Sequence, residues 1–239
     1  MSTQVAILAG GLGTRLRPIT EKIPKPMVEV AGKPFLHWQL LDLKSQGYTR
    51  VLLLVAYLGE QVRDYFGSGE KFGMQIDYVF EPEPLGTGGA LRNALDKLDD
   101  EFILLNGDSF LHAPLRVFEK FARQFEATVS TYAEFQKVPV IPNLKIDDFN
   151  GFVIDYQKEA GVARGFDHID SGIYFLKRRL LEGIEVDRFA LADLWPALIE
   201  QKAFGAFPVK ERFYDIGTPE RLKEFEEKVR DYFPNTVSN

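Results

Sequence analysis

The sequence contains no cysteine. Disulfide bonds and thiolate metal sites are therefore excluded, which fits a protein of a reducing compartment. No apolar run approaches the ~20 residues that a membrane-spanning helix needs, and the chain does not open on a basic and then apolar signal segment. We therefore expect a cytoplasmic protein that has no membrane partner.

Familiar catalytic and phosphate-binding patterns are missing as well. The three histidines, His37, His112 and His168, are scattered and fit neither a Ser-His-Asp arrangement nor an HExxH motif, so we expect structural roles for them. A dinucleotide-binding G-x-G-x-x-G pattern that starts at Gly11 fails at its sixth position, Leu16, and no P-loop lysine follows. The net charge of −6 argues against a nucleic-acid partner, because nucleic-acid binders usually present a basic face.

Apolar runs alternate with helical patterns along the first half of this 239-residue chain. Short runs of branched apolar residues predict strands, and apolar residues at helical spacing predict helices. The expected strands are 4–8, 50–56, 74–81 and 102–108, and the expected helices are 35–47, 58–66 and 86–95. This alternation is typical of a parallel, doubly wound α/β sheet.

After about residue 127 the pattern changes. Strands are predicted at 127–135, 151–156 and 171–176 with fewer helices between them, so this half is expected to be mixed or antiparallel and continuous with the first sheet. The proline-containing segment 138–151 predicts a loop or an edge element. Residues 219–232 predict an amphipathic terminal helix. The apolar faces of this helix and of 35–41 could serve a homodimer, although core packing is the commoner use.

The first predicted strand runs into the stretch "LAGGLGTRLRP", Leu8 to Pro18. Glycine lets backbone N–H groups approach a ligand closely, and arginine binds oxyanions with two prongs. Residues 11–33 contain five basic and only two acidic residues, in a chain that is acidic overall. This local charge indicates a small polyanionic ligand. A tight turn that requires glycine would explain the glycines, but it does not explain the arginines.

Three further charged residues are candidates for the same chemistry. In "IPKPM", Pro24 and Pro26 restrict the backbone around Lys25, so its ammonium can meet a phosphate at little entropic cost, unless it is an ordinary solvated lysine. Asp108 in "NGDS" follows an apolar strand, and Asp215 in "FYDIGTPERL" precedes the terminal helix. Either aspartate could be a turn or cap residue. Together with the basic loop, they indicate metal-assisted chemistry on a nucleoside triphosphate.

The stretches "LAGGLGTRLRP", "PKPM", "EPLGTGGAL", "NGDS" and "DIGTPE" occur in this order. With them the chain resembles the sugar-1-phosphate nucleotidyltransferases over nearly its whole length. The resemblance implies an α/β fold with a Rossmann-like, mixed and mainly parallel sheet flanked by helices. It implies a single domain, 1–239, with a nucleotide-binding half (1–126) and a sugar-binding half (127–239). The implied reaction joins an NTP and a sugar 1-phosphate into an NDP-sugar and pyrophosphate, with Mg²⁺ as cofactor.

The resemblance also implies roles for individual residues. The implied catalytic residues are Arg15, Lys25 and Asp108, and the implied metal ligands are Asp108 and Asp215. The nucleotide-binding residues would be Leu8, Gly10, Gly11, Gly13, Thr14, Arg15, Gly86, Thr87 and Gly88. The sugar-binding residues would be Glu81, Asn106, Gly107 and Ser171.

The chain departs from the family pattern at one place. Many members carry a Glu-Lys-Pro segment before the strand that matches "SGIYFL", and its lysine contacts the sugar phosphate; here Arg164 or His168 could take that role. The motifs look most like guanylyltransferases for mannose or heptose 1-phosphates. A uridylyltransferase for N-acetylmuramate 1-phosphate ranks second and a thymidylyltransferase third. A non-catalytic sugar-nucleotide sensor is the rival from another class, but it would be expected to lack one of the key charged residues.

Overall fold

The computed structural model describes residues 2–158, 161–234 and 236. The chain divides into two compact units that alternate along the sequence. Unit 1 comprises Met1–Pro84, Asn106–Phe110 and Tyr214–Asn239, and unit 2 comprises Leu85–Leu105 and Leu111–Phe213. The expected division at residue 126 into a nucleotide-binding and a sugar-binding half remains a prediction.

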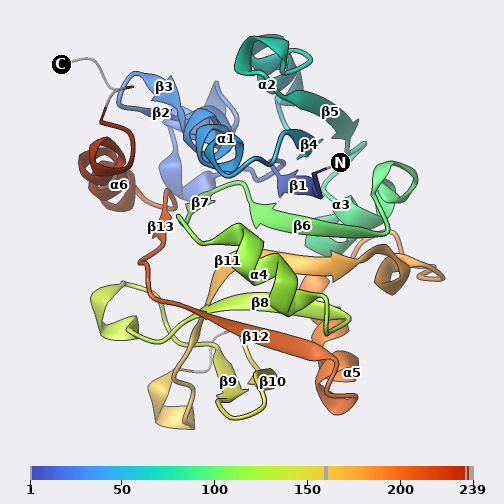
Figure 1. Cartoon of the computed structure of the whole chain (residues 1–239). Helices are drawn as coiled ribbons and strands as arrows, with labels where there is room; N and C mark the ends of the chain where they lie inside the picture. Colours follow the sequence, from blue (N-terminus) through green and yellow to red (C-terminus); the bar gives the residue numbers. More distant parts are fainter. Residues whose placement is uncertain (1, 159–160, 235, 237–239) are drawn as a thin grey trace. The chain divides into compact units, whose positions relative to one another are not determined.

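Unit 1 contains three parallel strands, with β4 in the middle (Figure 1). They are β1 (Gln4–Leu8), β4 (Arg50–Val55) and β5 (Gln75–Phe80). Val5 pairs with Val51, and Arg50 pairs with Gln75. The continuous apolar runs of β1 and β4 are buried, as expected for strands whose two faces are both covered. The predicted parallel arrangement is confirmed.

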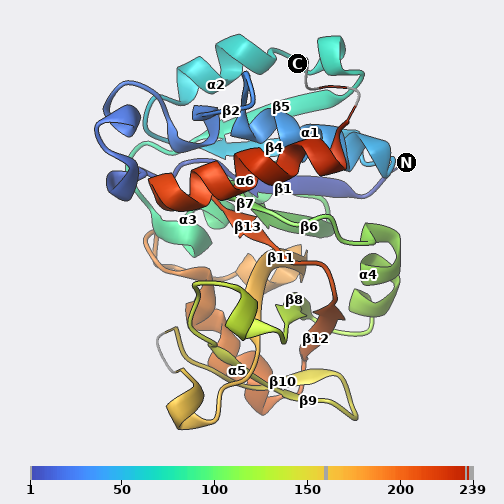
Figure 2. The same cartoon turned by 90° about the vertical axis from the view of Figure 1, so that its left-hand side faces the viewer.

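The helices of unit 1 are α1 (Phe35–Ser45), α2 (Gly59–Phe66) and α6 (Pro219–Tyr232). Figure 2 looks onto α6. Phe35 and Trp38 of α1 share one core cluster with Phe225 and Val229 of α6, and the rings of Phe35 and Phe225 lie 5.2 Å apart. The apolar faces of these two helices are therefore used in the core of the unit.

Short elements complete unit 1. Two antiparallel ladders are formed by β2 (Glu29–Val30) with β3 (Lys33–Pro34), and by β7 (Ser109–Phe110) with β13 (Tyr214–Asp215). Single 3₁₀ turns are η1 (Thr14–Leu16), η2 (Ile19–Glu21), η3 (Lys25–Met27) and η4 (Glu70–Phe72). The sequence patterns did not predict these ladders, because two-residue strands carry no periodicity.

Unit 2 contains a mixed sheet in the order β6-β11-β8-β12-β10-β9. Its strands are β6 (Glu101–Asn106, whose last residue belongs to unit 1), β8 (Ala127–Tyr132), β9 (Leu144–Asp147), β10 (Phe152–Tyr156), β11 (Ile169–Lys177) and β12 (Phe204–Val209). β12 runs parallel to β8, and the other pairings are antiparallel. The predicted mixed arrangement is confirmed, and the segment 138–151 contains the edge strand β9.

The helices of unit 2 are α3 (Gly86–Asn93), α4 (Leu115–Ala122) and α5 (Trp195–Glu200). Its 3₁₀ turns are η5 (Leu95–Lys97), η6 (Phe135–Lys137), η7 (Val162–Arg164), η8 (Arg178–Leu181) and η9 (Leu191–Leu194). α4 packs on β8 and β12, and α5 packs on β10 and β12, where Trp195 stacks on Phe204 with ring centroids 4.4 Å apart.

Among the described residues, no helix has both the length and the apolar content needed to cross a lipid bilayer.

Candidate active site

The "NGDS" turn places Asp108 beside the end of β1. The amide of Gly107 donates a hydrogen bond to the carbonyl oxygen of Leu8 at 3.1 Å. A Cβ at Gly107 would lie only 2.4 Å from that same oxygen, so only glycine allows this approach. The predicted residues Leu8, Asn106, Gly107 and Asp108 therefore meet at one place in unit 1.

A glutamine side chain of α1 fixes the "NGDS" turn by donating hydrogen bonds to backbone carbonyls of the turn. Gln39 is 3% exposed, and its Nε2 donates hydrogen bonds to the carbonyl oxygens of Asn106 at 2.9 Å and of Ser109 at 2.7 Å. These two carbonyls bracket Asp108, so a single amide group sets the path of the backbone on both sides of it. Sequence reasoning missed Gln39, whose only signal is a polar residue among the apolar residues of an expected helix.

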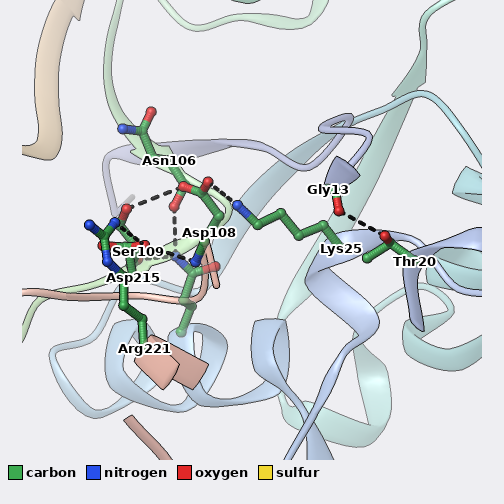
Figure 3. A network of polar contacts seen from close by, with 10 residues as sticks. Gly13, Thr20, Lys25, Asn106, Asp108, Ser109, Asp215 and Arg221 are labelled. Atoms are coloured by element: carbon green, nitrogen blue, oxygen red, sulfur yellow. Dashed lines mark hydrogen bonds and ion pairs between the residues drawn. The ribbon is translucent and has the colours of Figure 1, made fainter. Parts of the chain in front are cut away.

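Lys25 reaches the carboxylate of Asp108 from η3 (Figure 3). Its Nζ lies 2.5 Å from Asp108 Oδ2, and the side chains are 9% and 39% exposed, respectively. The Ser109 hydroxyl donates to the other carboxylate oxygen of Asp108 at 3.2 Å. Lys25 and Asp108, which the sequence analysis gave separate roles, are thus in direct contact in the structure.

The second predicted aspartate lies on the strand paired with β7. Asp215 of β13 stands opposite Ser109, and the amide of Ile216 donates to the carbonyl oxygen of Asp108 at 3.0 Å. This ladder places Asp215 beside the backbone of the Asp108 turn, although the two aspartates are far apart in the sequence. Arg221 Nη1 lies 3.0 Å from Oδ1 and 2.9 Å from Oδ2 of Asp215 (Figure 3). Arg221 was not predicted.

The glycine-rich turn follows β1 in the same unit. A Cβ at Gly10 would lie 2.7 Å from Oε1 of Glu81, so the predicted sugar-binding glutamate borders this turn. Gly13 has a φ of +60°, and its carbonyl accepts a hydrogen bond from the Thr20 hydroxyl at 2.8 Å. At Gly11, by contrast, an added Cβ would meet none of the described atoms within 4 Å. The backbone of Gly11 is therefore open to a ligand.

Arg15 is an exposed residue of η1 that lies close to the carboxylate of Asp215. A Cβ at Gly217 would lie 2.9 Å from Arg15 Nη2 and 2.6 Å from Asp215 Oδ1. The guanidinium therefore lies against the "DIGTPE" segment, next to Asp215. Unit 1 thus gathers the predicted residues Gly10, Gly11, Gly13, Thr14, Arg15, Lys25, Glu81, Asp108 and Asp215.

The "GTGG" glycines belong to unit 2, where they contact residues of their own unit. The amides of Gly88 and Gly89 donate to the carbonyl of Phe189 at 3.1 and 3.2 Å, and the Thr87 hydroxyl accepts from the amide of Leu191 at 2.8 Å. A Cβ at Gly88 would lie 2.2 Å from the Phe189 ring. Gly86 has a φ of +78°. The close packing of these residues against Phe189 and Leu191 accounts for the glycines. Their role toward a nucleotide base remains a prediction.

The predicted sugar-side residue Ser171 is also in unit 2. It is 2% exposed, and its hydroxyl shares a 2.7 Å hydrogen bond with the Ser130 hydroxyl. Of the two candidates for the missing lysine, Arg164 donates to Gln157 Oε1 at 3.3 Å, and His168 Nδ1 lies 2.7 Å from Asp167 Oδ1.

Asp170, which sequence reasoning missed, precedes Ser171 at an irregularity of β11. Its carboxylate accepts hydrogen bonds from the Tyr174 hydroxyl at 2.5 Å and from the amide of Gly172 at 2.9 Å. Burial raises the pKa of Asp170 to about 6, although both hydrogen bonds act in the opposite direction. Burial therefore disfavours the charged form of this acid.

A family model described as nucleotidyl transferase matches residues 4–142, which include the glycine-rich turn, Lys25 and Asp108. The chain belongs to this family. The resemblance read from the motifs is thereby confirmed, and the chain is a nucleotidyltransferase.

Relatives that are named for their activity match most of the chain. It is 32% identical over 223 residues to the D-glycero-alpha-D-manno-heptose 1-phosphate guanylyltransferase of Campylobacter jejuni, covering 93% of this chain and 98% of that protein. It is also 32% identical over 223 residues to the N-acetylmuramate alpha-1-phosphate uridylyltransferase of Neisseria meningitidis, with 91% and 94% covered. The crystal structure of HddC from Yersinia pseudotuberculosis matches with a TM-score of 0.81 and 33% identity, over 95% of this chain and 99% of that chain. The predicted fold class is confirmed.

Proposed function

We propose that this chain transfers a nucleotidyl group from an NTP to a sugar 1-phosphate and releases pyrophosphate, with GTP and a heptose- or mannose-type 1-phosphate as its substrates. The observation that carries the proposal is the grouping of Lys25, Asp108 and Asp215 next to an open glycine-rich turn within one compact unit. The similarity to heptose 1-phosphate guanylyltransferases supports GTP and a heptose as the first choice.

The reaction requires the approach of two polyanions. A phosphate oxygen of the sugar 1-phosphate attacks the α-phosphorus of the NTP in line, and the bond to pyrophosphate breaks. The attacking oxygen is already anionic near pH 7, so no general base is needed. Catalysis then consists of positioning and charge neutralisation, for which Arg15 and Lys25 supply fixed positive charge beside the turn.

The backbone amides of the turn would approach the triphosphate at Gly11, where no described side chain blocks the way. Leu8, Gly10, Gly13 and Thr14 would complete the nucleotide side in unit 1, and Gly86, Thr87 and Gly88 are proposed for the base. On the sugar side we propose Glu81, Asn106, Gly107 and Ser171. Ser171 is buried against Ser130, so its hydroxyl is already engaged within unit 2.

The two aspartates fit a magnesium ion. Asp108, which directly precedes β7, and Asp215 of β13 each offer carboxylate oxygens. The described residues hold no cluster of three or more His, Cys, Asp or Glu that could bind a metal, so any ion would depend on these two carboxylates. Mg²⁺ commonly takes one or two carboxylates and leaves its other positions to water and substrate phosphates. When bound, it would neutralise charge on the phosphates of both substrates.

The test is pyrophosphate release from a panel of four NTPs combined with heptose, mannose, glucose and N-acetylmuramate 1-phosphates. We expect turnover with GTP and a heptose or mannose 1-phosphate, and none from Asp108→Asn, which removes one carboxylate charge at a partly exposed position. Turnover with UTP and N-acetylmuramate 1-phosphate would favour the second activity, which the similarity to the Neisseria enzyme supports. A sugar-nucleotide sensor would release no pyrophosphate from any pair.

A further inference from the structure

Arg221 contacts both carboxylate oxygens of Asp215. Nη1 of Arg221 lies 3.0 Å from Oδ1 and 2.9 Å from Oδ2, while the amide of Gly217 donates to Oδ1 at 2.8 Å. The side chains of Arg221 and Asp215 are 22% and 16% exposed, so water screens this pair only in part. Asp215 therefore has a built-in counter-ion.

The position of Arg221 on its helix points to the same role. α6 begins at Pro219 after the cap residue Thr218, whose hydroxyl accepts from the amide of Arg221 at 3.4 Å, so Arg221 lies in the first turn. The N-terminal end of a helix carries partial positive charge, which favours acidic residues and disfavours arginine there. The ion pair with Asp215 offsets this unfavourable placement.

Two ion pairs lie beside the β7–β13 ladder. Lys25 neutralises Asp108, and Arg221 neutralises Asp215. Without Arg221, Asp215 would lose its ion-pair partner, and the guanidinium of Arg15, which lies next to Asp215, would be the cation left beside it. Arg221 thus neutralises Asp215 through an ion pair while no metal ion is bound.

A divalent cation at either oxygen of Asp215 would lie beside the guanidinium. The ion must then either displace the Arg221 guanidinium from Asp215 or bind next to it against charge repulsion. Both cost free energy. A polyphosphate ligand changes this balance, because it adds negative charge and offers the guanidinium another anion to bind. We propose that Arg221 competes with the divalent cation for Asp215, so that the metal binds weakly alone and tightly together with the nucleotide. This inference rests on the metal site proposed above.

The test is binding of Mn²⁺, a paramagnetic substitute for Mg²⁺, followed by electron paramagnetic resonance of the full chain without nucleotide. We expect Arg221→Gln to bind Mn²⁺ about tenfold more tightly than wild type, because the charged hydrogen bonds that compete for Asp215 are lost. Arg221→Met serves as a second neutral variant in case the first does not fold. Arg230→Gln, which removes the same charge from an exposed position of α6, is the control and should match wild type.

A second arm repeats the titration with an unreactive methylene analogue of the NTP that the substrate panel selects. There we expect wild type and Arg221→Gln to agree within about threefold, since the phosphates supply the missing negative charge. Equal Mn²⁺ affinity of wild type and both neutral variants without nucleotide would overturn the counter-ion role. If Asp215→Asn leaves Mn²⁺ binding unchanged in both arms, the proposed metal site itself is wrong. The failure of the counter-ion role and the failure of the metal site therefore give different results.

Discussion

Lys25 Nζ lies 2.5 Å from Asp108 Oδ2, at the end of a side chain that is 9% exposed. The lysine follows Pro24 and precedes Pro26, which limits the backbone conformations available to it. The ammonium is therefore held in place by the fold, next to Asp108 and beside the glycine-rich turn where we place the triphosphate.

Replacing this lysine tests that placement. We expect Lys25→Ala to lower kcat about 100-fold, the loss of about 3 kcal/mol that is usual for one electrostatic donor to a transition state. The matched control is Lys22→Ala, an exposed lysine of the same loop, which should keep the wild-type kcat. A kcat of Lys25→Ala within threefold of wild type would remove Lys25 from the site.

The sequence alone predicted β1 and β6, because each is a continuous apolar run that ends at a glycine-containing turn. It did not predict the two-residue strands β7 and β13, which carry Ser109 and Asp215. It did not predict Gln39 or Arg221. Gln39 acts on the carbonyls of Asn106 and Ser109, which are distant in the sequence, and Arg221 acts on Asp215 across the start of a helix. Such contacts depend on which helix faces which turn, and no local pattern encodes that.

The hydrogen bonds of Gln39 predict a positioning role for this residue. Gln39→Met keeps the side-chain length but leaves the carbonyls of Asn106 and Ser109 without their donor, which we expect to cost about 1–3 kcal/mol of unfolding free energy. Because these carbonyls bracket Asp108, kcat should also fall and the Mg²⁺ concentration for half-maximal rate should rise.

A control separates this role from a loss of stability. Gln46→Met removes the hydrogen bond from Gln46 Nε2 to Asp42 Oδ2, at the C-terminal end of α1. We expect it to lower the melting temperature while kcat and the Mg²⁺ requirement stay at wild-type values. If Gln39→Met changes only the melting temperature, its role is structural and Asp108 is positioned without it.

The glycine-rich turn offers a matched pair of substitutions. In Gly11→Ala, the new methyl group meets none of the described atoms within 4 Å, so stability should be unchanged or should rise by up to about 1 kcal/mol. The same methyl group would stand where we place the triphosphate, so KM for the NTP should rise about tenfold, a penalty of about 1.4 kcal/mol.

Gly10→Ala should instead lower the stability of the protein. Its methyl group would lie 3.0 Å from Ala56 Cβ and 3.3 Å from the Ala56 backbone nitrogen, which cannot move away as a flexible side chain could, so it should lower the unfolding free energy by about 1 kcal/mol. Chemical denaturation and steady-state kinetics of both variants provide the measurement. An unchanged KM for the NTP in Gly11→Ala would mean that the nucleotide does not approach the turn at this residue.

The buried acid of unit 2 predicts a pH-dependent stability. Burial raises the pKa of Asp170 to about 6 from an ordinary value of 3.8, so ionising this group in the folded protein costs free energy. The cost is absent well below the ordinary pKa, where Asp170 is protonated in both the folded and the unfolded state, and it grows as the pH rises toward the folded-state pKa of about 6.

The substitution Asp170→Asn removes the ionisable group and so removes this cost. We therefore expect the unfolding free energy of the variant, relative to wild type, to increase between about pH 4 and about pH 7 and to level off above that range. Urea titrations at each pH measure this difference, and Asp148→Asn, at an exposed aspartate of the same unit, shows how much of it comes from the loss of any carboxylate. A difference that stays constant over this pH range would show that Asp170 ionises in the folded protein as readily as in the unfolded chain.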